Sequence, residues 1–181
     1  LGILLGAVEK ELLGQSSSIQ TDRPDQTECP FIVPSKWLQA ENGFLYERAG
    51  ETEKKTTHPS VLWRYGISSN VECRLITEWA TQKSAGSNYT GLSPVTAGFK
   101  VKIAEEKGMI PEMAFIGHLT VGKWGSSYFK SDYTAPSFRF TMQHSITKKI
   151  GLGYNVGAEW DGVNKEATWI YTFAPGINLS K

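Results

Sequence analysis

The sequence predicts an all-β protein, an antiparallel up-and-down transmembrane β-barrel of about eight strands. Three observations predict this fold. From residue 35 onward, apolar and polar residues alternate with period two, and a helical period is nearly absent. Short turns alternate with longer polar loops, as in barrels of the bacterial outer membrane. Aromatic residues make up 12% of the chain beside 18 glycines, which suits β-strands, tight turns and membrane–water interfaces.

The composition of the chain also limits which other classes of protein it could belong to. The 181 residues are enough for one domain, and the net charge of +1 favours neither nucleic acid nor an anionic surface as a partner. Because no apolar run reaches eighteen residues, the sequence predicts no transmembrane helix. A membrane protein of this composition must then be a barrel, since closure is the other way to satisfy every backbone group in lipid.

Residues 1–34 are predicted to be an irregular lead-in, and residues 35–181 the barrel domain. The first eight residues fit the remnant of a signal peptide or a short amphipathic helix. Pro24, Pro30 and Pro34 exclude regular structure in the segment before the first strand. Asp22, Arg23 and Asp25 are interpreted as a structural clasp, with the arginine held by its acidic neighbours; a ligand site or part of a plug is the alternative.

The strands follow one another at regular spacing. The strands expected in the first half are 37–47, 60–66, 71–81 and 95–103, and those in the second half are 110–121, 137–146, 152–160 and 167–177. The clearest alternation sets Val95, Phe99 and Val101 against Lys100 and Lys102. Longer polar loops are expected at 50–57, 83–93, 123–136 and 161–166, with short turns between them. The short turns and the amino terminus then face the periplasm.

Alternation by itself leaves open which face is inside. A soluble lipocalin-like binder places its apolar face inward, whereas a membrane barrel reverses this arrangement. Large aromatic side chains near the strand ends favour the reversed order, because they suit interfacial girdles. Charges of both signs on the polar face could pair inside a narrow lumen. The predicted lumen-lining residues are Glu41, Arg64, Arg74, Glu78, Lys100, Lys102, Glu112, His118, Arg139 and Glu159.

Several motifs resemble a known family. They are Thr21–Pro34 (TDRPDQTECPFIVP), Leu38–Glu41, Trp63–Gly66 and Glu105–Gly108. Together they resemble the outer-membrane transporters grouped with MetA-like proteins of the phenol-degradation meta pathway, common in Bacteroidetes-type bacteria. The resemblance implies an outer-membrane barrel with a transport role and says little about the substrate. Cys29 stands where the family pattern has serine. The ending at 178–181 resembles a turn leading into another strand, which suggests a larger barrel from which a hairpin or two is missing. An eight-stranded barrel closed as it stands is the alternative.

The sequence offers little catalytic chemistry. His58, His118 and His144 have no metal-ligand spacing, and no nucleophile motif is present, so we expect no enzyme, metal or cofactor. One alternative pairs His118 with Glu112 as a proton relay in an outer-membrane lipid hydrolase or protease. The leading hypothesis is a passive channel or transporter for small molecules, hydrophobic ones included. Its partners would be outer-membrane lipid and a small-molecule substrate, not nucleic acid.

Overall fold

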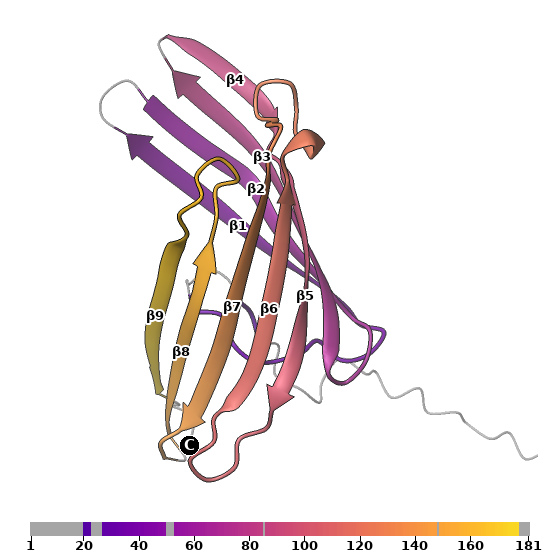
Figure 1. The fold of residues 1–181 in the computed structure, drawn as a ribbon, viewed down its shortest axis with the longest axis vertical. Coiled ribbons are helices and arrows are strands. Elements are labelled where there is room, and N and C mark those ends of the chain that lie inside the picture. The colour runs from indigo at the N-terminus through magenta and orange to yellow at the C-terminus, as the bar shows by residue number, and fades with distance from the viewer. Residues whose placement is uncertain (1–19, 23–26, 50–52, 85, 148, 178–181) are drawn as a thin grey trace, which may run out of the picture.

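The strands form one curled antiparallel sheet (Figure 1). The computed structural model describes residues 20–22, 27–49, 53–84, 86–147 and 149–177. Neighbouring strands follow the chain in the order β1-β2-β3-β5-β6-β7-β8-β9, and β4 pairs with β3 beside this path. This half-barrel confirms the predicted all-β, up-and-down antiparallel fold. Within the described residues, β1 and β9 each pair with a strand on one side only.

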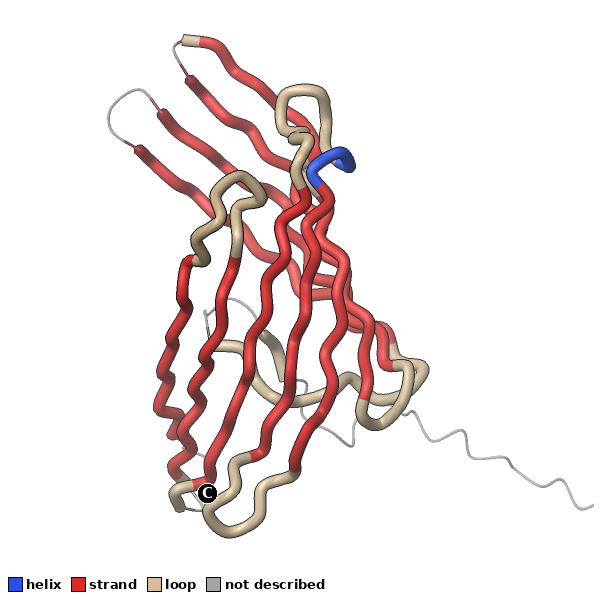
Figure 2. The backbone as a smooth tube through the Cα atoms, in the orientation of Figure 1, coloured by secondary structure: helices blue, strands red, loops and turns tan. Residues whose placement is uncertain are grey.

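The nine strands have the following bounds. They are β1 Leu38–Ala49, β2 Glu53–Gly66, β3 Val71–Ser84, β4 Ser87–Leu92, β5 Val95–Ala104, β6 Glu112–Val121, β7 Thr134–Ser145, β8 Ile150–Glu159 and β9 Thr168–Ile177. One short 3₁₀ helix, Gly122–Trp124, follows β6 and is the blue turn in Figure 2. No helix in the described part of the chain has the length and apolar character needed to cross a membrane.

All eight expected strands are present, but two expected loops are largely strand. The loop predicted at 83–93 contains β4, and the loop predicted at 50–57 contains the start of β2. β4 and β5 both pair with β3 and act as one long strand interrupted at Ser93–Pro94. Proline has no N–H to continue the ladder, so the break falls there. The tips of these hairpins carry polar residues on both faces, so they lack the apolar–polar alternation from which a strand is predicted.

The connections lie at two ends of the sheet. Figure 1 shows the tight turns after β2, β5 and β7 at the bottom and the β3–β4, β6–β7 and β8–β9 connections at the top. We call these the turn end and the loop end. The order is the one the sequence predicts for an outer-membrane barrel.

The two faces of the sheet differ sharply in polarity. On one face, Arg64 and Lys100 are 0% exposed, whereas Tyr171 and Phe173 on the other are 74% and 68% exposed. The buried polar set on the concave face includes Glu41, Ser60, Arg64, Glu72, Arg74, Lys100, Thr141 and Asn155. The exposed set includes Trp63, Tyr65, Leu75, Trp79, Phe99, Leu119, Trp169, Tyr171 and Phe173. Charged groups are inside and aromatic groups outside, the reverse of a soluble barrel.

Candidate functional site

The lead-in segment, residues 20–22 and 27–34, crosses the concave face of the sheet in its lower half (Figure 1, indigo). Side chains from five strands bond to its backbone. Glu41 of β1 accepts from Asp22 N at 2.9 Å, and Glu72 of β3 accepts from Val33 N at 2.8 Å. Arg64 of β2 donates to Phe31 O at 2.8 Å, and Lys100 of β5 donates to Cys29 O at 2.8 Å. Asn155 of β8, with its amide placed to satisfy both ends, accepts from Glu28 N and donates to Glu28 O. The side chains of the sheet therefore supply the hydrogen bonds that an irregular buried segment lacks.

Arg64 and Arg74 lie directly opposite each other on β2 and β3. Like charges in that position repel, so each arginine needs an acidic partner. Glu72 Oε1 accepts from Arg64 Nε at 2.9 Å and from Arg74 Nη1 at 3.1 Å. Glu41 Oε1 accepts from Arg64 Nη1 at 3.0 Å. The carboxylates thus offset the repulsion between the two arginines.

Asp22 is the centre of the charged contacts. Its Oδ2 lies 2.6 Å from Arg74 Nη1, 2.7 Å from Lys100 Nζ and 3.3 Å from Arg64 Nη1. Burial alone raises the pKa of the Asp22 carboxyl, but Lys100, Arg74 and Arg64 together hold it well below its usual range. Asp22 is therefore ionised at neutral pH and bonds β2, β3 and β5 to the lead-in segment.

Cys29 and Glu28 complete the contacts of the lead-in segment. Burial and the nearby Asp22 raise the pKa of the Cys29 thiol to about 12, and its Sγ donates to Asp22 Oδ1 at 3.2 Å. Glu28 accepts from Arg74 Nη2 at 2.7 Å and lies 3.5 Å from Arg139 Nη1 of β7. We call the connected set the ion network: Asp22, Glu28, Glu41, Glu72, Arg64, Arg74, Lys100 and Arg139.

His118 of β6 lies beside this network. Its Nε2 accepts from Arg74 Nε at 3.1 Å, and its ring covers Gly98, where a Cβ atom would overlap the ring. Glu112 pairs instead with Lys102 at 3.4 Å. The proposed pairing of His118 with Glu112 is therefore not formed. An imidazole nitrogen that accepts from a guanidinium has no lone pair left to take a proton, so this geometry disfavours the proton relay.

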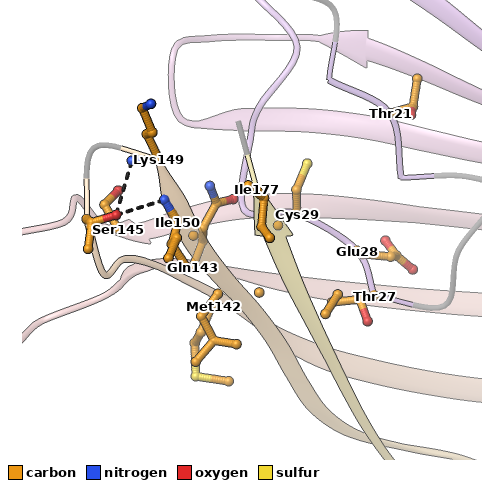
Figure 3. Close-up of a pocket in the computed structure, with 16 residues that line it drawn as sticks. Thr21, Thr27, Glu28, Cys29, Met142, Gln143, Ser145, Lys149, Ile150 and Ile177 are labelled. Carbon is orange, nitrogen blue, oxygen red and sulfur yellow. Dashed lines mark hydrogen bonds between the residues drawn. The ribbon is translucent and has the colours of Figure 1, made fainter. Parts of the chain in front are cut away.

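The lead-in segment separates two cavities. The turn-side cavity, of about 480 Å³, lies between Thr27 to Cys29 of the lead-in segment and Met142, Ile150 and Ile177 of β7 to β9 (Figure 3). The loop-side cavity, of about 630 Å³, has Asp22, Glu28 and Arg74 at its floor. Its further lining residues are Leu45, Leu62, Ile76, Glu78, Thr96, His118, Thr120, Ser137, Arg139, Glu159 and Ile170.

The predicted lumen residues divide into three groups. Glu41, Arg64, Arg74, Lys100 and Arg139 belong to the ion network, with His118 against Arg74. Glu78 and Glu159 line the loop-side cavity outside the network. Lys102 and Glu112 pair with each other, and Lys102 also pairs with Glu105. Of the predicted clasp, Asp22 contacts the barrel residues above, while Arg23 and Asp25 lie outside the described residues.

Glu72, Glu28 and Asn155 were not among the predicted lumen-lining residues or the predicted clasp residues. Glu72 carried a usable signal, because it alternates with Arg74 on the polar face of β3 and pairs in register with Lys100. Asn155 carried a weaker one, since it falls on the polar face of a glycine-rich strand. Glu28 carried none, since no periodicity exists in the lead-in segment to orient it. Within the described residues, no group of three or more His, Cys, Asp or Glu side chains is arranged to hold a metal ion.

The fold and the site define a β-barrel-type protein whose charged interior is occupied by a segment preceding the first strand. The chain belongs to the family described as "Putative MetA-pathway of phenol degradation", whose model matches residues 21–181. The match includes the lead-in segment from Thr21 as well as the strands. No curated protein and no solved structure matches the chain.

Proposed function

We propose that the protein is a β-barrel of the bacterial outer membrane, and that it admits small molecules, hydrophobic ones included, through a lumen plugged by the lead-in segment. The observation that carries the proposal is the sidedness of the sheet. Its buried face holds the ion network, and its exposed face holds large aromatic and aliphatic side chains. Water would penalise such an exposed apolar surface, whereas lipid would not.

The same sidedness argues against a soluble lipocalin-like binder. In that class the apolar face encloses the ligand and the charges face water. Here Arg64 and Lys100 are fully buried on the concave face, and Trp169 on the convex face is 61% exposed. A barrel in lipid has no open edge, so the proposal requires that β1 and β9 each gain a strand partner in the membrane.

The plug supports controlled passage rather than catalysis. The lead-in segment is bonded by side chains of five strands, so free diffusion along the lumen needs its displacement. Its ion pairs with the barrel are made by Asp22 and Glu28, and both carry charges that can be neutralised without a change in size. We propose no catalytic role for the lumen residues.

The membrane proposal is tested on the complete reading frame refolded into detergent. We expect a β-sheet species whose gel mobility shifts on boiling, and no such species from the same protein refolded in aqueous buffer alone. A water-soluble β-protein with unshifted mobility would overturn the proposal.

The plug is tested by planar-bilayer recording. The double variant Asp22→Asn, Glu28→Gln should conduct more often than the unmodified protein, because it loses both acidic contacts of the plug. The matched control is Glu105→Gln, Glu106→Gln, which removes two exposed carboxylates at the turn end. No current from either form of the barrel would contradict a transport role.

A further inference from the structure

The loop-side cavity is lined by both aliphatic and hydroxyl side chains. Leu45, Leu62 and Ile76 form an aliphatic wall from β1 to β3, and Ile170 of β9 adds to it. Hydroxyl groups of Thr96, Thr120 and Ser137 line the cavity from β5 to β7, and Thr96 pairs in register with Ile76. At about 630 Å³ the cavity has the size of a small-molecule site, and its lining has the mixed character of one.

The charges around this cavity do not balance. The ion network at its floor contains four cationic and four carboxylate side chains, so it is neutral as a whole. Two further carboxylates line the cavity and lie outside this network, those of Glu78 and Glu159. Glu78 accepts from Ser60 Oγ at 2.7 Å, and neither carboxylate forms an ion pair with any residue of the described ranges. Counted over the described residues that line the cavity or belong to the ion network, the carboxylates exceed the cations by two.

A cleft with an excess of one sign of charge raises the local concentration of ligands of the opposite sign. Rings of acidic side chains select cations in membrane pores for the same reason. An anion would meet Glu78 and Glu159 before it reached Arg74 and Arg139, and both arginines already contact Glu28.

We propose that the loop-side cavity binds small organic cations, with Glu78 and Glu159 facing the cationic group and the aliphatic wall contacting the apolar body. This inference rests on the proposed barrel lumen and names the chemical class of its ligand.

The experiment uses three probes with one ring and different charges: benzyltrimethylammonium, benzyl alcohol and benzoate. Binding to the complete detergent-refolded protein is measured by calorimetry, after the heat-dependent mobility shift has shown that the barrel is folded. We expect the ammonium to bind about tenfold more tightly than the alcohol, because each carboxylate adds a Coulomb attraction. We expect benzoate to bind most weakly. Added salt should reduce the ammonium preference.

The variant Glu78→Gln, Glu159→Gln should remove the ammonium preference and leave binding of the alcohol unchanged. The control Glu105→Gln, Glu106→Gln changes the net charge equally and should keep the preference. Equal binding of the three probes, tightest binding of benzoate, or no binding by a folded barrel would overturn the inference alone. Failure to form the heat-modifiable barrel would overturn the proposed function, and the inference with it.

Discussion

Glu72 is the residue on which the two opposed arginines depend. It is 0% exposed, and its two oxygens accept from Arg64, Arg74 and the Val33 N–H. Removing one partner from a buried ion pair leaves an uncompensated charge, which costs about 3–5 kcal/mol. We predict that Glu72→Gln lowers the free energy of unfolding by an amount in this range, measured by urea titration of the refolded barrel.

The control for this prediction is Glu47→Gln. Glu47 pairs with Lys55 at 4.0 Å, and both side chains are exposed to solvent. Exposed pairs contribute about 0–1 kcal/mol. Equal effects of the two substitutions would show that the ion network does not stabilise the fold.

Gly98 leaves room for the His118 ring on the neighbouring strand. A Cβ atom at residue 98 would overlap that ring, whereas at Gly151 the nearest heavy atom is His144 O at 3.7 Å. Overpacking of this kind costs about 1–3 kcal/mol. We predict that Gly98→Ala destabilises the barrel by such an amount and that Gly151→Ala does not, by the same titration. A neutral Gly98→Ala would mean that the His118 ring can move away from Arg74 without loss.

Individual site residues were predictable where strand alternation oriented them. Arg64, Arg74 and Lys100 fall on one face by period two, and the structure buries all three together. Their partners Asp22 and Glu28 could not be placed in the same way. They lie outside any strand, so no repeating pattern states which way their side chains point.

β4 and the loop after β6 form one packed element at the loop end. Ser126 Oγ accepts from Leu92 N at 2.8 Å, and Ser126 N donates to Leu92 O at 2.8 Å. The rings of Tyr89 and Tyr128 stack with centroids 3.6 Å apart. A Cβ atom at Gly91 would lie 2.6 Å from Ser126, so the loop needs glycine there to approach β4.

We predict that Gly91→Val separates this loop from β4. Trypsin should then cleave more rapidly at Lys123 and Lys130, as followed by mass spectrometry of the refolded barrel. Thr90→Val is the control, because the Thr90 hydroxyl forms its hydrogen bond with Thr81 of β3 and not with the loop. Unchanged cleavage of Gly91→Val would show that the loop is held by other contacts.

Whole elements were predictable to different degrees. The strands from β5 to β9 matched their predicted ranges closely, because each has one apolar and one polar face. β4 was expected to be loop, since Ser87 to Leu92 lacks that contrast. Strand pairing with β3 overrides the weak local pattern there. The path of the lead-in segment across the sheet depends on contacts with five strands, and a local sequence argument does not contain them.

At the scale of the molecule, the convex face offers a natural reporter. Cys73 is exposed and lies in register between Tyr65 and Phe99, both also exposed. We predict that a nitroxide on Cys73, in a Cys29→Ser background, is accessible to oxygen and shielded from a polar nickel complex in proteoliposomes. A nitroxide on Ser87→Cys at the loop end should show the reverse. Equal access of the nickel complex to both would place the convex face in water.

The contacts of the lead-in segment join residues far apart in the chain. Asp22 and Lys100 are separated by 78 residues, and Glu28 and Arg139 by 111. Closing loops of that length costs conformational entropy, and contacts between residues close in the sequence do not offset this cost. The complete network can form only after the strands from β1 to β7 have come together. The lead-in segment therefore binds to the sheet late in folding. A lead-in segment bound by the ion network indicates that the sheet has already assembled.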